Sequence, residues 1–310
     1  MADLKNTQSV MNRLNRISPV TNFAFNTFFL ILAIVCFSPI LIIFLISITD
    51  VNIVAREGYK IIPKLDEIKI DAYKYLWTQR KTIFQALWIS VSTTCTATVI
   101  GVILNCTMGY VLSRKEYFLR DPLIYFIFVT MVFGGGMAAS YVINDRFLHL
   151  RDTFIILVLP ACCGAGNVIL AKTFFRTTIH DSIIESCKID GASQMQIFFK
   201  IVVPISKPVI ATIGMFIAFG VWNDWFTAKL YISNTELFSL QAMLNKMQET
   251  LDYLTKNPVA GLTASDLKKS MPGEGVRMAI AFVVALPICI SYPFFQKYFI
   301  TGLSVGSVKG

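Results

Sequence analysis

The sequence predicts an all-α membrane protein, and three observations lead to this fold class. First, 55% of the 310 residues are hydrophobic and only 15% are charged, which is too apolar for a soluble domain. Second, several apolar stretches reach the roughly 17 to 25 residues that a helix needs to cross a bilayer. Third, they lack the alternating pattern of about ten residues that marks a membrane β-strand. We expect six transmembrane helices, at residues 23–47, 83–112, 123–142, 153–171, 209–223 and 278–295.

The first span starts after a basic leader that contains Lys5, Arg13 and Arg16. Its apolar run is longer than the core of a signal peptide and lacks a small-residue cleavage site, so we expect it to remain in the mature protein. Residues 1–22 then form a cytosolic N-terminal segment, and residues 23–310 form one transmembrane domain. In that domain we expect a polar inner loop at about 176–207 and long outer segments at about 48–82 and 226–277.

Six spans place both termini on one side of the membrane, and the basic residues indicate which side. Lys and Arg in short segments near span ends mark the cytosol, whereas long outer segments are translocated largely regardless of charge. Basic residues of this kind are Lys5, Arg13, Arg16, Arg114, Lys115, Arg120, Lys172, Arg176, Lys188, Lys200 and Lys207. Both termini are therefore predicted to be cytosolic. The net charge of +9 is explained by a rim that faces lipid headgroups, so no nucleic-acid partner is expected.

The cysteines and histidines predict no disulfide and no reactive site. The seven cysteines lie within spans or on the inner side, at positions 36, 95, 106, 162, 163, 187 and 289. None falls in the long outer segments, and no CxxC spacing indicates zinc or redox chemistry. His149 and His180 lie in separate short loops without a partner for metal binding or catalysis. We therefore predict no metal site and no catalytic residue.

The predicted spans also lack a source of energy. Transporters driven by ion gradients place ionisable side chains within the membrane to bind the proton or sodium ion. The first four spans contain none, and Asp224 and Arg277 lie only at the ends of the last two. The sequence has no GxxxxGK[ST] loop to hold nucleotide phosphates either. These features are typical of one subunit of a machine whose motor is a separate chain.

The inner loop carries local signals for a helix, a sharp bend and a second helix. Apolar and polar residues mix over 181–201 in a way that suits helices outside lipid with one face packed. Gly191 is able to take positive φ and end the first helix, while Ser193 and Gln196 form a capping box that begins the second. Pro204 and Pro208 limit the second helix. The alternative is an ordinary amphipathic loop with capping signals.

Residue identity in this loop also points to a family. The pattern has an acid, a glycine six residues later and a closing Ile-x-x-Pro: Glu185, Ser186, Cys187, Asp190, Gly191, Ala192, Ser193, Ile201 and Pro204. It resembles the EAA loop in the membrane subunits of ATP-driven (ABC) importers, in the branch that imports oligosaccharides. Ser186 and Cys187 replace two alanines, and both are small enough to preserve close packing. The resemblance to permeases for complex oligosaccharides extends to residues 134–136, 167–175, 222–225 and 302–310.

The resemblance implies a type I importer (MetI-like) permease fold with a cytosolic coupling helix in this loop. The nine residues of the pattern would dock in a cleft of an ATP-hydrolysing subunit. The implied partners are a second homologous permease, two ATP-binding subunits, an extracytoplasmic solute-binding protein, an oligosaccharide and the lipid of a bacterial cytoplasmic membrane. ATP and Mg would be bound by the partner subunits, so this chain would be a transport subunit without a cofactor or enzyme activity of its own.

Residues near the outer ends of the spans are candidates for the sugar path, because sugars are held by polar groups and aromatic rings. The candidates are Trp222, Asn223, Asp224, Trp225, Tyr141, Asn144 and Gly135. Residues 134–136 are able to form a backbone bend that lines a cavity, because broken helices at membrane depth are tolerated where they face protein or water. The alternatives are an interfacial aromatic belt with a helix-ending Asn-Asp pair for residues 222–225, and close helix packing for the glycines. Single polar residues such as Asn105 are expected to form hydrogen bonds between helices.

A second class of function is a membrane scaffold or enzyme subunit whose inner loop binds a partner other than an ATPase. An enzyme needs converging acids, bases or metal ligands. The sequence contains neither GxSxG nor HExxH, and its two histidines are far apart. The transport subunit is therefore the preferred interpretation.

Overall fold

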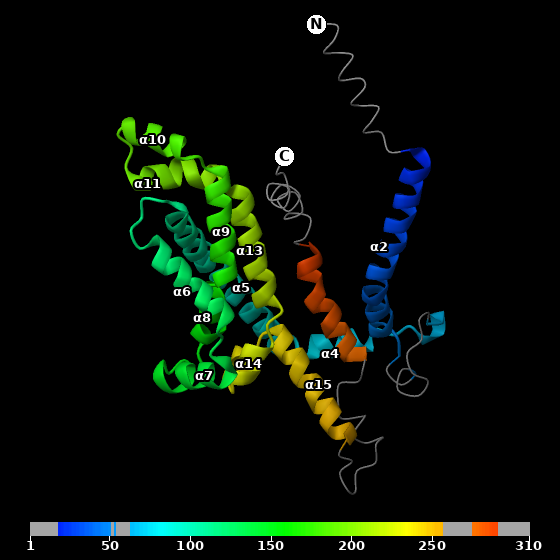
Figure 1. Ribbon diagram of the computed structural model, residues 1–310. Helices are drawn as coiled ribbons and strands as arrows, with labels where there is room; N and C mark the ends of the chain where they lie inside the picture. Colours follow the sequence, from blue (N-terminus) through cyan, green and yellow to red (C-terminus); the bar gives the residue numbers. More distant parts are fainter. Residues whose placement is uncertain (1–17, 51–52, 54–62, 257–274, 291–310) are drawn as a thin grey trace. The chain divides into compact units, whose positions relative to one another are not determined.

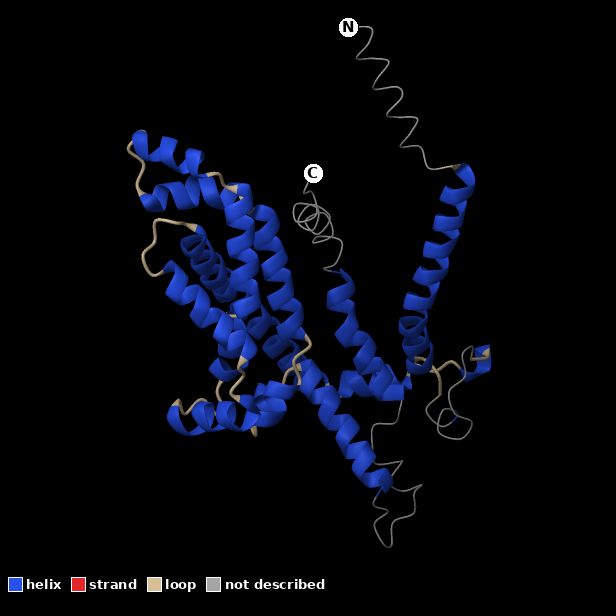
Figure 2. Ribbon diagram, in the orientation of Figure 1, coloured by secondary structure: helices blue, strands red, loops and turns tan. Residues whose placement is uncertain are grey.

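The computed structural model describes residues 18–50, 53, 63–256 and 275–290, and within these ranges the chain is helical (Figures 1 and 2). The β-pairing seen there is an isolated antiparallel bridge between Thr49 and Ile68. The prediction of an all-α protein is thus confirmed for the described residues. The chain forms two compact units, residues 1–73 with 273–282 and residues 74–272 with 283–310.

The first unit contains the long helix α2 (Pro19–Ser47) and the short 3₁₀ helix η1 (Leu65–Glu67). α2 begins where the Ser18 hydroxyl accepts the N–H of Thr21, with Pro19 at the first helical position. Its other end is held by a hydrogen bond between the hydroxyls of Ser47 and Tyr73. Most of its apolar side chains are exposed within this chain, as expected for a helix that faces lipid or another subunit.

The described helices of the remaining chain have the following bounds. They are α4 Asp71–Thr78, α5 Arg80–Ser113, α6 Arg120–Val132, α7 Gly136–Val142, η2 Ile143–Phe147, α8 Phe154–Cys162, α9 Ala165–Thr178, α10 Asp181–Ile189, α11 Gln194–Ile197, η3 Phe198–Val202, α12 Val203–Ile205, α13 Lys207–Trp222, α14 Phe226–Tyr231, η4 Thr235–Leu237, α15 Leu240–Lys256 and a helix at Gly275–Ile290. Both η2 and η3 are short π-helical stretches.

In the second unit, α5 is the central helix, and small side chains let its neighbours approach it closely. A Cβ atom at Gly109 would lie 2.4 Å from the Cβ of Ala171 in α9. A Cβ atom at Gly101 would lie 2.7 Å from the Cδ1 of Ile217 in α13. Both distances are too short for real atoms. Gly109 requires glycine because the backbone nitrogen of Lys172 also lies within 2.9 Å, whereas at Gly101 the flexible end of Ile217 would have to shift. Close packing through small residues is typical of helix bundles in membranes.

Asn105, between these two glycines on the same face of α5, bridges the break between α8 and α9. Its amide nitrogen donates to the carbonyls of Gly101 and Cys162, and its amide oxygen accepts the N–H of Gly164. The side chain is fully buried. The two helices bend by 41° at this break, which frees backbone groups that need new partners. The predicted role of Asn105 in bonding between helices is confirmed.

The spans agree with the prediction at some places and differ at others. Two described helices, α2 and α5, are long and apolar enough to cross a membrane alone, and three bent pairs pass the same test together. The span expected at 123–142 is not one straight helix: the chain turns by 113° between α6 and α7, at the glycines for which a backbone bend was one of the two alternatives. Gly136 has a φ of +77° at this turn, a conformation that glycine adopts readily. The span expected at 153–171 is broken and continues to Thr178.

Some predictions fall partly on residues that are not described. Residues 1–17 of the N-terminal segment, parts of both outer segments, residues 291–295 of the last span and the motif at 302–310 lie outside the described ranges.

The seven cysteines are free, in agreement with the expectation of no disulfide.

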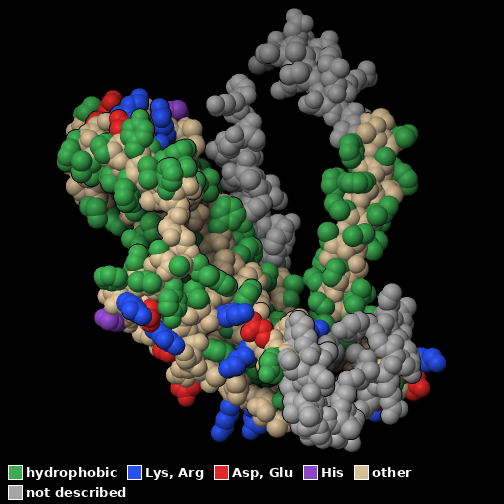
Figure 3. All heavy atoms as spheres, turned by 60° about the horizontal axis from the view of Figure 1, so that its bottom comes forward, with side chains coloured by type: hydrophobic (Ala, Val, Ile, Leu, Met, Phe, Trp, Pro, Cys, Tyr) green, Lys and Arg blue, Asp and Glu red, His purple; other side chains and the backbone are tan. Residues whose placement is uncertain are grey.

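Polar side chains gather at the two ends of the second unit. In Figure 3, Lys, Arg, Asp and Glu lie over α10 and α11 at one end and near α7 and α14 at the other, with hydrophobic side chains between them. Tyr125, Phe126 and Phe128 of α6 are examples of large apolar side chains exposed in this band. An apolar band between two polar ends is the surface expected of a protein that crosses a bilayer.

Candidate functional site

The candidate coupling segment, residues 181–205, begins with α10, which ends in a Schellman motif. The N–H of Gly191 donates to the carbonyl of Lys188, and the N–H of Ala192 donates to the carbonyl of Cys187. Gly191 has a φ of +78°, and no atom lies within 4 Å of where its Cβ would be. Glycine is therefore favoured here by the backbone conformation and not by crowding. The predicted end of the first helix at Gly191 is confirmed.

The second helix of the segment begins at α11 with the predicted capping box. The Ser193 hydroxyl accepts the N–H of Gln196 at 3.3 Å, and the Gln196 side chain accepts the N–H of Ser193 at 2.9 Å. These two bonds satisfy backbone donors that the first turn of a helix leaves free. With the motif at Gly191, they fix a sharp turn of four residues, 190–193, between α10 and α11.

The helix that starts at α11 continues through η3 and α12 and then bends by 79° into α13. Pro204 has no N–H to donate, and the π-helical turn of η3 directly before it changes the hydrogen-bond register. Ser206 lies at the bend and is fully buried, and Pro208 is in the first turn of α13. The helix ends at Ile205, between the two prolines as expected, but Val203 and Lys207, which precede them, are both helical. The candidate coupling segment is therefore joined to α13 by one bent connection.

The segment is held to the bundle by a few buried side chains and presents the rest outward. Ile184 of α10 and Ile197 of α11 are buried in the core that α5, α8, α9 and α13 share. The other side of the segment is exposed and includes large apolar side chains, with Ile189 at 86% and Met195 at 66% exposure. Among the predicted coupling residues, the exposed ones are Glu185, Ser186, Asp190, Gly191, Ser193 and Pro204, and the partly buried ones are Cys187, Ala192 and Ile201.

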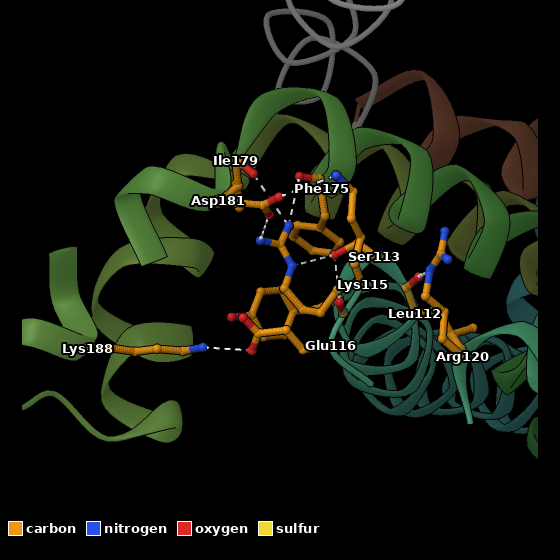
Figure 4. Close-up of polar contacts among 11 residues, drawn as sticks. Leu112, Ser113, Lys115, Glu116, Arg120, Phe175, Ile179, Asp181 and Lys188 are labelled. Atoms are coloured by element: carbon orange, nitrogen blue, oxygen red, sulfur yellow. Dashed lines mark hydrogen bonds and ion pairs between the residues drawn. The ribbon is translucent and has the colours of Figure 1, made fainter. Parts of the chain in front are cut away.

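Two polar ties that sequence analysis missed connect α10 to the chain just after α5. Arg114 donates from Nη1 to Asp181 Oδ1 at 3.2 Å, at the start of α10. At the other end of the helix, Lys188 Nζ donates to Glu116 Oε2 at 2.8 Å (Figure 4). This hydrogen bond raises the pKa of the Lys188 ammonium above its usual 10.5. The partners are 67 and 72 residues apart in sequence, so no local pattern indicates them.

A cleft of about 660 Å³ lies between α10, α11 and the end of α5. Tyr110 at its floor packs against Phe198, with ring centroids 5.1 Å apart. Its lining residues are Thr107, Tyr110, Val111, Arg114, Lys115, Glu116, Tyr117, Asp181, Ile184, Glu185, Lys188, Gln194, Met195, Phe198 and Phe199. The charged residues among them comprise three cations and three carboxylates, so the lining has no strong preference for either sign.

At the opposite end of the unit, the four residues 222–225 have different surroundings. Trp222 is buried, and its indole N–H donates to the carbonyl of Val284 at 3.2 Å. Asp224 Oδ1 accepts the N–H groups of Phe226 and Thr227, which caps the start of α14. Asn223 and Trp225 are exposed. Trp222 and Asp224 are therefore engaged in packing and capping. Asn223 is exposed, but its amide donates to the Phe219 carbonyl and accepts from the Gln241 side chain.

Tyr141 and Asn144 both contact Tyr231 of α14. Tyr141 stacks on Tyr231 with ring centroids 5.5 Å apart, and the Asn144 amide donates to the Tyr231 hydroxyl at 3.1 Å. Both are only partly buried. Gly135 has an ordinary helical φ of −65°, and the left-handed residue at this break is its neighbour Gly136. The structure thus groups an aromatic pair and an amide beside the break in the α6–α7 span.

Comparisons with known proteins decide the family. No protein-family model matches the chain. It is 34% identical over 283 residues to the polygalacturonan/rhamnogalacturonan transport system permease protein YtcP of Bacillus subtilis strain 168, covering 91% of this chain and 96% of that protein. The chain belongs to the permease subunits of carbohydrate ABC importers.

Other relatives of this permease agree. The maltodextrin transport system permease protein MalD of Streptococcus pneumoniae strain R6 is 27% identical over 287 residues, covering 90% of this chain and 92% of that one. A crystal structure of a bacterial ABC transporter involved in the import of the acidic polysaccharide alginate contains a chain that matches with a TM-score of 0.75 and 28% identity, over 90% of this chain and 96% of that one. The permease is thus a membrane transport subunit and not an enzyme, and ATP hydrolysis belongs to separate subunits of such importers.

Proposed function

We propose that this permease takes up oligosaccharides delivered by an extracytoplasmic binding protein, together with a second homologous permease and two ATP-binding subunits that hold ATP and Mg. The exposed face of the coupling segment supports this proposal most directly. Exposed Ile189 and Met195 lie beside exposed polar residues such as Glu185. Large apolar side chains outside the apolar band need a protein partner, and the sharp, hydrogen-bonded turn at Gly191 gives that partner a rigid surface.

The fold assigned by this proposal is the type I importer permease with six spans, one of which is α2 and another α5. The three bent pairs supply three more, and the helix at Gly275–Ile290 belongs to the last. Both termini and the coupling segment would lie in the cytosol of the bacterium, with α7 and α14 on the outer side. Residues 1–22 would precede a single transmembrane domain at 23–310.

In the proposed cycle, closure of the ATPase subunits moves the coupling segment, and the nine residues of the EAA-like pattern form the contact. The motion reaches α13 through the 79° bend at Ser206. The sugar path lies near the outer end, where Asn223, Trp225, Tyr141 and Asn144 supply hydrogen-bonding groups and aromatic faces. For Trp222, Asp224 and Gly135 we propose a supporting role beside that path.

The test replaces Gly191 in the assembled transporter. Gly191→Val places a branched side chain at a φ of +78°, which costs roughly 1–2 kcal/mol of local conformational energy. Gly166→Ala is the matched control, because Gly166 is helical and no atom lies within 4 Å of its Cβ position. We expect the Val variant to lose copurification of the ATPase subunit and the control to retain it. Retention by both variants at wild-type levels would show that the turn is not the contact.

The substrate is tested by uptake of a labelled glycan panel into cells with and without this permease. Since the relatives transport polygalacturonan, maltodextrin and alginate according to their names, the panel contains oligosaccharides of each. Loss of uptake of one class on deletion identifies it. Unchanged uptake of every oligosaccharide tested would contradict carbohydrate import by this chain.

A further inference from the structure

Arg114 joins three helices at the end of the unit that carries the coupling segment. Besides Asp181 of α10, its guanidinium donates to the carbonyls of Phe175 and Ile179 at the end of α9, at 3.3 and 3.4 Å. Its Nε donates to Ser113 Oγ, the last residue of α5, at 3.0 Å. The side chain is only 15% exposed. An Arg fork is suited to this task, because a lysine ammonium is a point charge that lacks the fixed, planar arrangement of donors.

The carbonyls that Arg114 binds lie at the C-terminal end of α9, where a cation is favourable. The Arg114 guanidinium adds a second donor to the Phe175 carbonyl, which already accepts the N–H of Ile179. Arg114 therefore stabilises the end of α9 and the start of α10 with one side chain. Its guanidinium also lies 5.3 Å from the ring centroid of Tyr110, one turn earlier in α5.

The second tie holds the other end of α10. Lys188 and Glu116 form an ion pair with side-chain exposures of 35% and 75%, so solvent weakens it more than it weakens the contacts of Arg114. Asp181 and Lys188 are seven residues apart, or about 10 Å along the helix axis. Residues 114 to 116 thus hold α10 near both of its ends, across the cleft above Tyr110 and Phe198.

The tie matters because α5 runs through the whole unit. Its 34 residues span about 50 Å. Near its other end, Ser90 Oγ accepts the N–H of Leu240 in α15, and Gln85 donates to the carbonyl of Glu236 in η4. A displacement of α10 that is passed to α5 would therefore reach the elements next to the candidate sugar path. α13 receives the same displacement through the covalent bend at Ser206.

We propose that Arg114 is a positioning residue that carries motion of the coupling segment into α5, parallel to the covalent route into α13, with the Glu116–Lys188 pair as a weaker second fastening. This inference rests on the proposed function of residues 181–205. With both routes intact, α5 and α13 move together. Without Arg114, α10 pivots where it joins the end of α9, and its displacement is passed to α13 but not to α5.

The experiment measures hydrogen–deuterium exchange in the assembled transporter, with and without ATP and vanadate. The variant is Arg114→Gln. The matched control is Arg120→Gln, since Arg120 also donates to a carbonyl of α5, that of Leu112, but pairs with Asp121 instead of α10. We expect wild type and control to show a nucleotide-dependent change of exchange, at least threefold, in the last turn of α5. Arg114→Gln should lose this change while the change in α13 persists.

A second experiment reverses the charges of the Glu116–Lys188 pair. It also tests the proposal if the Arg114→Gln permease does not assemble with its partner subunits. Glu116→Lys places two cations together and should reduce the change in α5 by about half, and Glu116→Lys with Lys188→Glu should restore it. A role in stability alone would raise exchange in α10 equally with and without nucleotide. The proposal is overturned if hydrogen exchange in wild-type α5 does not change with nucleotide. It is also overturned if Arg114→Gln keeps the full change in α5. If Arg114→Gln does not assemble, Glu116→Lys takes its place, and retention of the full change by that variant overturns the proposal. Failure of wild type to copurify with an ATPase would instead contradict the proposed function.

Discussion

The two ends of the second unit use their distinctive residues in opposite ways. At the α10–α11 end, Gly191 and Ser193 are exposed, and they end one helix through a positive φ and start the next through a capping box formed by the Ser193 hydroxyl. At the α7–α14 end, Trp222 and Asp224 act through their side chains, in contacts with Val284 and with the first turn of α14. One end leaves its outer face free for a partner, whereas at the other end many polar and aromatic side chains stabilise the fold.

The contrast has a physical origin. A turn fixed by local hydrogen bonds needs little burial, so its outer face stays free for a partner. At the other end, short helices such as α14, with six residues, cannot hold their shape through their own hydrogen bonds. They depend on caps and on contacts with other elements. Substitutions at the two ends should therefore separate effects on coupling from effects on folding.

The largest expected effect tests this separation at the α14 end. Trp222→Ala removes a buried indole together with its hydrogen bond to Val284, and large-to-small changes of this kind cost about 3–5 kcal/mol. Trp225→Ala is the control, since Trp225 is 38% exposed. Thermal unfolding of the purified permease in detergent should show a large loss of stability for the first variant and a small one for the second. Equal losses would remove the distinction between the two tryptophans.

These contacts show what sequence analysis was able to predict. The positive φ at Gly191 and the box of Ser193 with Gln196 depend on residues at most a few positions apart, so the pattern contains the whole signal. The all-helical class and the position of α5 follow from apolar length in the same way. The role of Asn105 was also foreseen, because a lone amide in an apolar span needs a partner from another helix.

Other features depend on contacts that no short stretch contains. The ties of Arg114 and Glu116 join residues 67 and 72 positions apart, and packing of α5 against α9 brings them together. For the glycines at the 113° turn between α6 and α7, a bend and close packing both stayed open, since apolar composition is the same in a straight and a broken helix. The aromatic and polar types at 222–225 suit both a sugar and a structural contact, so their part in the path stays a prediction.

The second prediction concerns the cap of α14. Asp224→Ala removes the acceptor for two backbone N–H groups, and loss of such a cap costs about 0.5–2 kcal/mol. Asp224→Asn keeps a side-chain oxygen and should recover most of the loss. The midpoint of thermal unfolding measures both. If Asp224→Ala instead abolished sugar uptake without any change in stability, Asp224 would belong to the path and the contrast between the ends would weaken.

The third prediction sharpens the contrast at the coupling end. Ser193→Ala breaks the capping box and should raise hydrogen exchange at the start of α11 by about threefold or more, the equivalent of roughly 0.7 kcal/mol. Global unfolding should change little, because the site is exposed. Ser186→Ala is the control, since the exposed Ser186 hydroxyl only bonds back to the Ser182 carbonyl within α10. A global loss of stability in Ser193→Ala as large as that of Trp222→Ala would show that the two ends do not differ.

The smallest expected effect depends on pH and lies at the α7–α14 end. Asp152, which has a φ of +54°, accepts the backbone N–H groups of Asn234 and Ser233, and these bonds lower the pKa of its carboxyl below the usual 3.8. Folding then favours the ionised form, so the stabilisation is present above pH 3.8 and is lost as pH falls through the lowered pKa. Asp152→Asn tolerates the same backbone conformation but carries no charge. Its unfolding midpoint should lie slightly below that of wild type at pH 7, and the difference should vanish in acid. Because the carboxylate is exposed, solvent screening keeps this difference small, and a difference that grew as pH fell would contradict the assigned hydrogen bonds.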